Sequence, residues 1–207
     1  MDEFPTRPPE ATSIEDALPP DWWEMHRAKW IGGVVLVLVA IVAWTIFSYN
    51  QRKRELEART ALSAAASVEQ LQEVSANYTG TPEAASAAFL RGIALMESEK
   101  WDEAFEAFGA FEKTYPEHAL TGGAVAAQAV VREMQGKFEE AKSLYQRVGT
   151  SYQNSYAAPF AMIGEARMYE QMGSPEDARK MLTEIVTRMP GSVFAGEAAA
   201  LLERPVR

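Results

Sequence analysis

Three short segments of the chain follow one pattern: Lys100-Trp101-Asp102-Glu103-Ala104, Lys137-Phe138-Glu139-Glu140-Ala141 and Ser174-Pro175-Glu176-Asp177-Ala178. The alanine that ends each segment lies 37 residues after the alanine of the segment before it. The same spacing, found twice, indicates a repeat array in which each unit packs against the next.

The match between the three units continues on both sides of these segments. Upstream, Gly92 aligns with Ala129 and Ala166. Downstream, the aligned positions are mostly large and apolar: Phe108, Tyr145 and Leu182; Phe111, Val148 and Ile185; Tyr115, Tyr152 and Met189; then Pro116, Gln153 and Pro190. Apolar residues recur at helical spacing, and Ala, Glu, Leu and Met dominate the region. We therefore predict an all-α domain.

The pattern of small and aromatic residues resembles the tetratricopeptide repeat. Gly92, Ala104, Phe108 and Pro116 carry the resemblance in full: a small residue, an alanine twelve residues later, an aromatic ring four residues after that, and a proline that ends the second helix. The resemblance implies an α-solenoid of about three helical hairpins plus flanking helices. Small residues let the two helices of a hairpin approach closely, and the aromatic ring fills the space beside them.

Two features depart from the family's pattern. The second unit has Gln153 in place of the proline, and the period is 37 residues where the family usually has 34. The distances from the small residue to the alanine and from the alanine to the proline are kept. The three additional residues are therefore expected in the connections between units, near His118 to Thr121 and Ser155 to Ala158.

Helices are also expected at both ends of the array. One further period upstream, the residues in register with the second helix of the first unit are Ser67, Leu71, Val74 and Tyr78. We predict one orphan second helix from about Glu57 to Tyr78, which caps the first unit. Residues from Ser192 to Glu203 predict one closing helix over the third unit.

Composition limits the chemistry available to the chain. It has 207 residues, a formal net charge of −9 and no cysteine, which excludes disulfides, thiol nucleophiles and cysteine-ligated metals. Two histidines, His26 and His118, do not suggest a metal site. An acidic chain of this kind is not expected to bind nucleic acid. Glu97, Glu133 and Glu170 follow the repeat spacing with no nucleophile or base beside them, so we expect no enzyme activity and no cofactor.

An apolar segment lies ahead of the array. No residue from Ile31 to Phe47 is charged, and with its aromatic neighbours the stretch reaches about 20 residues, or roughly 30 Å of helix. Insertion of its apolar side chains into a bilayer is favourable by roughly 3 to 7 kcal/mol. The aromatic residues expected at the two membrane interfaces are Trp22, Trp23, Trp30, Trp44 and Tyr49. We predict a single transmembrane helix; the alternative is a buried helix of a globular domain.

The anchor is expected to be retained, because the residues after Ile46 contain no Ala-x-Ala cleavage site. Proline and acidic residues ahead of it predict a disordered segment. The predicted organisation is a disordered, acidic, proline-rich tail over residues 1–20, an interfacial turn and transmembrane helix over 21–49, a helical stalk over 50–60 and the solenoid over 61–207.

Basic residues flank the apolar segment unequally. Two precede it, Arg27 and Lys29, and four follow it: Arg52, Lys53, Arg54 and Arg59. The charge count alone therefore places the C-terminal domain in the cytoplasm, but the difference is small and a long domain translocates largely regardless of such counts. Arg52, Lys53 and Arg54 are also expected to contact lipid phosphates, or an acidic loop of a partner protein.

Partner contacts are expected on the first helices of the hairpins, which line the concave face in the tetratricopeptide family. The positions implied by the resemblance are Phe89, Ile93, Met96 and Glu97; Val130, Glu133 and Met134; and Phe160, Ile163, Arg167 and Glu170. This mostly apolar, methionine-containing set suits an apolar or amphipathic segment of another protein. Arg167 is its one cation, so a clamp for a peptide carboxylate is not expected. The alternative is that several of these side chains pack between units.

The order of segments is similar to that of a bacterial family that includes the ancillary subunit of the Sec translocon. The resemblance implies an inner-membrane location, a cytoplasmic tail, a periplasmic array, and contacts with membrane proteins and periplasmic chaperones. The stretch Phe111-Glu112-Lys113-Thr114-Tyr115-Pro116 is also similar to repeats of a cell-division coordinator and of outer-membrane assembly lipoproteins.

Two functional hypotheses follow. In the first, the chain is a membrane-anchored adaptor or chaperone-like accessory subunit associated with protein export in the cell envelope. In the second, it is a structural accessory subunit of another inner-membrane complex, bound through its transmembrane helix and N-terminal tail. Both hypotheses require protein partners and membrane lipid.

Overall fold

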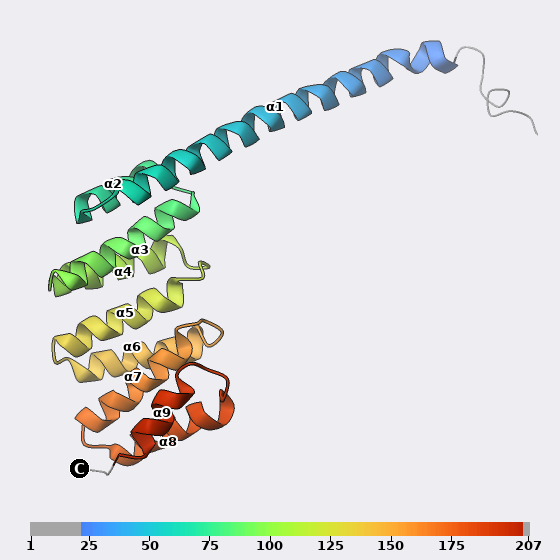
Figure 1. Ribbon diagram of the computed structural model, residues 1–207. Helices are drawn as coiled ribbons and strands as arrows, with labels where there is room; N and C mark the ends of the chain where they lie inside the picture. The colour runs from blue at the N-terminus through green and yellow to red at the C-terminus, as the bar shows by residue number, and fades with distance from the viewer. Residues whose placement is uncertain (1–21, 205–207) are drawn as a thin grey trace, which may run out of the picture. The chain divides into compact units, whose positions relative to one another are not determined.

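The computed structural model describes residues 22–204, with side chains from Met25 onward, so the tail predicted over residues 1–20 lies outside the described residues. Within residues 22–204 the chain forms nine helices and no strand, which confirms the all-α prediction. The helices are α1 (Trp22–Ala64), α2 (Val68–Asn77), α3 (Pro82–Glu97), α4 (Trp101–Thr114), α5 (Thr121–Met134), α6 (Phe138–Ser151), α7 (Ala158–Gln171), α8 (Pro175–Arg188) and α9 (Ala195–Leu202) (Figure 1). The chain divides into two compact units after Lys53, and the second unit contains the array.

The array repeats with the predicted period. The second helices of the hairpins, α4, α6 and α8, begin at residues 101, 138 and 175, each 37 residues after the last. Three residues join the two helices of each hairpin, whereas six join one hairpin to the next, at 115–120 and 152–157. The additional residues therefore lie between hairpins, as predicted, except that Thr121 and Ala158 already belong to the next helix.

Close contact between paired helices confirms the predicted register. A Cβ atom placed on Gly92 of α3 would lie 2.5 Å from the ring of Phe108 on α4, so glycine is what leaves room for this ring. Phe108 is fully buried. In the next hairpin Ala129 takes the place of Gly92, and the ring of Tyr145 packs instead on Gly164, in the following hairpin. Phe108 thus joins the two helices of one hairpin, and Tyr145 joins two hairpins.

The single helix predicted from Glu57 to Tyr78 is wrong, because α1 and α2 are separate helices. The Ser67 hydroxyl accepts a hydrogen bond from the backbone N–H of Gln70 at 3.3 Å and so caps the start of α2. The end of α1 and α2 therefore form a hairpin of their own. The predicted register still holds within it, since Leu71 is buried between these helices and α3.

The closing helix predicted from Ser192 to Glu203 is α9, which begins three residues later than expected. Ala198 of α9 is buried in the same apolar cluster as Leu182 and Ile185 of α8. The helix therefore covers the end of the third hairpin.

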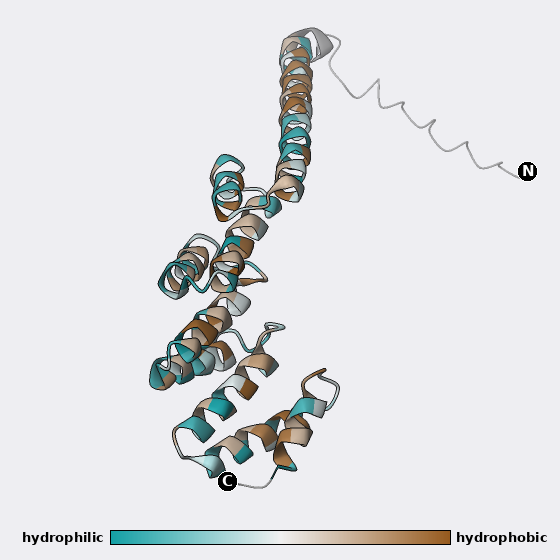
Figure 2. Cartoon of the chain, turned by 60° about the vertical axis from the view of Figure 1, so that its left-hand side comes forward, coloured by the Kyte–Doolittle hydropathy of each residue, from teal (hydrophilic) through white to brown (hydrophobic). Residues whose placement is uncertain are grey.

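The first unit contains the N-terminal part of α1. This part is long and apolar enough to cross a bilayer: its most apolar stretch has a mean hydropathy of 2.5, and none of that stretch is buried. Leu36 and Trp44 are among the most exposed of its side chains, and Figure 2 colours the stretch brown. A helix that is apolar on all sides needs an apolar environment, such as a bilayer.

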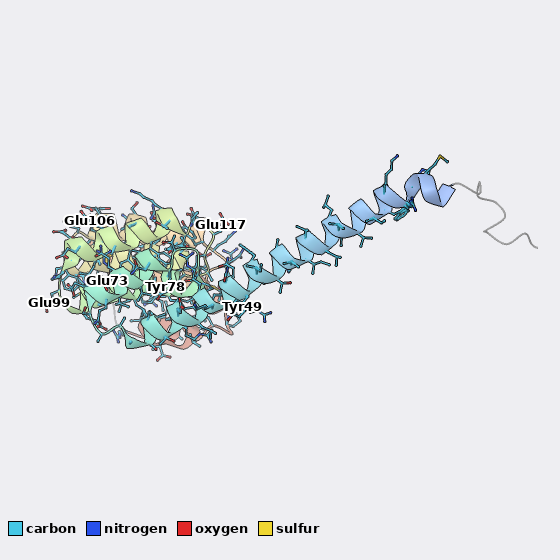
Figure 3. All side chains as sticks on the ribbon, turned by 90° about the horizontal axis from the view of Figure 1, so that it is seen from above. Tyr49, Glu73, Tyr78, Glu99, Glu106 and Glu117 are labelled. Carbon is cyan, nitrogen blue, oxygen red and sulfur yellow. The ribbon has the colours of Figure 1, made fainter. Side chains whose placement is uncertain are left out.

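Truncation of the ring that packs on Gly92 should destabilise the array. Phe108→Ala leaves a cavity between α3 and α4, which we expect to cost about 3 to 5 kcal/mol. Urea denaturation of the full chain in detergent micelles, followed by circular dichroism, measures the loss. Glu106→Ser, at an exposed position of the same helix (Figure 3), is the matched control and should leave the midpoint unchanged. An unchanged midpoint for Phe108→Ala would contradict the register.

Candidate partner-binding surface

The residues predicted to contact a partner all lie on α3, α5 and α7, the first helices of the three hairpins. The structure places them in different environments. Five are apolar, half-buried and packed on the core of the array: Phe89, Ile93, Met96, Val130 and Phe160. Three are exposed near the C-terminal ends of their helices: Glu97, Met134 and Glu170.

Phe89 and Phe160 hold their rings against buried rings of the core. The Phe89 centroid lies 5.6 Å from that of Phe108 and 5.7 Å from that of Phe111, both in edge-on geometry. The Phe160 centroid lies 6.3 Å from that of Tyr145, also edge-on. Such contacts are favourable and fix the orientation of each ring. The core therefore holds these two aromatic side chains in place while part of each remains exposed.

Ile163 is not a surface residue. It is 1% exposed and packs in one cluster with Leu182 of α8 and Ala198 of α9. The prediction of a partner contact at Ile163 is therefore wrong. The physical reason is the closing helix, which joins the cluster around the third hairpin, whereas the aligned position in the first hairpin, Phe89, stays half-exposed.

Glu133 and Arg167 form an ion pair between α5 and α7. The Arg167 guanidinium donates two hydrogen bonds to the Glu133 carboxylate, from Nε to Oε1 at 3.2 Å and from Nη2 to Oε2 at 3.1 Å. The Tyr145 hydroxyl of α6 donates to the same carboxylate, at 2.7 Å from Oε2. Burial, and then the Glu133 carboxylate, raise the pKa of Tyr145, so its hydroxyl keeps the proton that it donates.

The ion pair with Glu133 also shifts the pKa of Arg167. Burial acts to lower the pKa of its guanidinium, but the Glu133 carboxylate outweighs that effect and raises the pKa overall. The guanidinium donates to both oxygens of Glu133, a bidentate geometry that holds Arg167 against α5. Together with Tyr145, these side chains tie α5, α6 and α7 together.

Sequence reasoning missed Tyr156, in the connection between α6 and α7. Tyr156 is 60% exposed, and its hydroxyl lies directly over Gly123 at the start of α5. A Cβ atom on Gly123 would also lie 3.7 Å from the Phe89 ring, so Tyr156 and Phe89 flank the same backbone position. The signal was the Gly122-Gly123 pair, since glycine at the start of a helix permits close approach of another segment.

The residues predicted at the membrane interface fall partly outside the described side chains. The side chains of Trp22 and Trp23 lie outside the described ones. Three others are exposed along α1: Trp30, Trp44 and Tyr49. The first unit ends with Arg52 and Lys53. Arg54 belongs to the second unit. Its guanidinium donates to the backbone carbonyl of Asn77 at 3.2 Å and so satisfies a free carbonyl at the end of α2.

A stack of helical hairpins with half-exposed apolar side chains on its first helices defines a helical-repeat binding scaffold. The chain belongs to the tetratricopeptide repeat-like domain family, whose profile matches residues 20–200. This fold serves in general as a scaffold for protein–protein interaction.

One solved structure with a similar fold contains TPR-like repeats from a Podospora anserina protein described as a kinesin light chain. Its TM-score is 0.50 and its sequence identity 18%, over 70% of this chain and 76% of that chain. At that identity the likeness shows the fold alone. A comparison with curated proteins finds no match.

Removal of the carboxylate shared by Tyr145 and Arg167 should destabilise the array. Glu133→Ala leaves both donors without their partner, which we expect to cost about 1 to 2 kcal/mol because the ion pair is partly exposed to water. Tyr145→Phe removes one hydrogen bond and should cost about 1 kcal/mol. In a double-mutant cycle measured by urea denaturation, the two changes should not be additive.

The matched control is Glu170→Ala, at an exposed position on α7, which should leave stability unchanged. Strict additivity of Glu133→Ala and Tyr145→Phe would show that the contact between these residues contributes nothing.

Proposed function

We propose that the chain is a membrane-anchored adaptor or chaperone-like accessory subunit, associated with protein export, that binds an apolar or amphipathic segment of a partner protein. The observation that carries the proposal is the set of accessible apolar side chains on and beside the first helices. Phe89 and Phe160 are held by the core, and Tyr156 and Met134 are each 60% exposed. Aromatic rings and flexible methionines suit an apolar segment of variable sequence.

The proposed location is the inner membrane of the cell envelope. The apolar part of α1 would span the bilayer, with the aromatic residues Trp22, Trp23, Trp30, Trp44 and Tyr49 at its interfaces. Arg52 and Lys53 would face lipid phosphates. The domain limits proposed are those predicted from the sequence, although the compact unit of the array begins at Arg54, inside the proposed stalk.

The partner complex proposed is the Sec translocon, with the tail in the cytoplasm and the array in the periplasm. The order of tail, span and array supports this choice through its resemblance to the family of the ancillary translocon subunit. An accessible apolar surface on a periplasmic array would suit segments of proteins that have not yet folded.

The second candidate is a structural accessory subunit of another inner-membrane complex, bound through the span and the tail. The ion pair between Glu133 and Arg167 and the burial of Ile163 favour it. These predicted partner positions are used within the chain, and an array that acts as a spacer needs no open surface.

Polar substitution at the two most exposed apolar positions of the proposed surface should separate the candidates. Met134→Ser with Tyr156→Ser should leave the fold intact, because both side chains are mostly exposed, and should weaken crosslinking to translocon subunits at least tenfold. Glu106→Ser with Lys180→Ser, at exposed positions of α4 and α8, is the matched control and should crosslink normally. Crosslinking to an unrelated inner-membrane complex, kept in full by the Met134 and Tyr156 variant and lost on deletion of residues 1–29, would favour the second candidate.

The orientation can be tested independently of the partner. Because the array is long, we expect it to cross the membrane despite the basic residues Arg52 to Arg59. A reporter fused after Arg207 should therefore be active only when the reporter works in the periplasm. Activity only of a cytoplasmic reporter would show that the positive charges determine the topology.

A further inference from the structure

A groove lies between α6 and α8, the second helices of two successive hairpins, with α7 at its base. Its volume is about 640 Å³. Its apolar lining includes three methionines, Met162, Met181 and Met189. The groove is separate from the proposed partner surface, because no residue predicted for that surface lines it.

Two carboxylates line this groove. Glu165 of α7 is 6% exposed, and the Gln146 side chain donates to its Oε1 at 2.8 Å. Burial raises the pKa of Glu165, and the neighbouring Glu184 carboxylate contributes to the rise. Two carboxylates in a partly apolar groove are stabilised by a cation that lies near both.

Two cations of the chain act on these carboxylates without bridging them: Lys142 on Glu165, and Arg188, which also lines the groove, on Glu184. The Lys142 ammonium lies 3.0 Å from a carboxylate oxygen of Glu139, and Arg188 pairs with Glu184 along α8. Within the described residues, no ion pair is formed by Glu165. The position between Glu165 and Glu184 is thus without a bridging cation from the chain itself.

The junction between α4 and α6, one repeat earlier and called the preceding groove below, has a cation at the equivalent position. There, Arg147 of α6 reaches across to Glu112 of α4, with Nη2 at 2.9 Å from Oε2. The Tyr152 hydroxyl donates to the same carboxylate at 3.0 Å. One period later, Gly149 stands in place of Glu112, and Glu184 in place of Arg147. The bridge across the groove is lost, and the arginine is replaced by an acid.

We propose that the groove between α6 and α8 binds an apolar segment of a partner protein that carries one arginine or lysine, with the cation placed between Glu165 and Glu184. Charge complementarity selects this occupant, since the groove is lined by two carboxylates, Glu165 and Glu184, and one cation, Arg188, which leaves one negative charge for a cation of the partner. The three methionines adapt to the apolar side chains on either side of the cation. The guanidinium of the partner then takes the role that Arg147 has in the preceding groove.

The test uses the full chain in lipid nanodiscs and a display library of random 12-residue peptides. Selection on the wild-type chain is followed by counter-selection against Gly149→Glu with Glu184→Arg, which rebuilds the bridge of the preceding groove and closes this one. A Cβ atom on Gly149 would meet nothing within 4 Å, so the new side chain starts without a clash at Cβ. Thr183→Glu with Thr187→Arg places the same charges at exposed positions of α8 and is the matched control.

We expect the surviving peptides to carry an arginine or lysine between apolar residues. Their affinity should fall at least tenfold when citrulline replaces arginine, and at least tenfold with Glu165→Gln, which keeps the shape of the side chain. Affinity should be unchanged in the Thr183 and Thr187 control and in the Met134 and Tyr156 variant. The proposal would be overturned if no peptide survives, or if the surviving peptides lack a basic residue. It would also be overturned if the chain forms dimers that the Gly149 and Glu184 variant abolishes.

Discussion

The array depends on close approach between paired helices, which glycine makes possible beneath an aromatic ring. Gly92 and Phe108 form this contact within a hairpin, and Gly164 and Tyr145 form it between hairpins. A buried ring excludes water from a junction that neither helix covers alone, and dense packing makes the junction sensitive to single methyl groups. The two rings, Phe108 and Tyr145, follow the 37-residue period, whereas the glycines beneath them do not, because one lies in the same hairpin and the other in the next.

Differences between the hairpins also determine which surface positions make contacts within the array. The Tyr145 ring packs on Gly164 of α7 while its hydroxyl donates to Glu133 of α5, and Arg167 completes a cluster that joins three helices. Between α4 and α6, Arg147 bridges to Glu112, whereas Gly149 and Glu184 stand at the equivalent positions beside the groove between α6 and α8. Repeats that are alike in backbone therefore differ in which positions are used for the fold and which are left for a partner.

Much of the fold was predictable because it follows local pattern: the hairpin register, the long connections between hairpins and the apolar part of α1. The start of a separate helix after Ser67 could have been predicted from the spacing between Ser67 and Gln70. The repeat alignment instead treated the region as one helix. Contacts between hairpins were not readable. The burial of Ile163 depends on where α9 packs, and the approach of Tyr156 to Gly123 depends on a connection whose path no periodicity describes.

The central claim, that glycine under an aromatic ring sets the spacing of the helices, is tested most directly by a double-mutant cycle at Gly164 and Tyr145. Unfolding free energies of the full chain in detergent are measured for Gly164→Ala, Tyr145→Leu and the double variant. The account predicts that Gly164→Ala destabilises the wild-type chain by about 1 to 3 kcal/mol through overpacking. In the Tyr145→Leu background the same change should be neutral or stabilising, because the ring is gone and alanine favours the helix. Equal effects of Gly164→Ala in both backgrounds would contradict it.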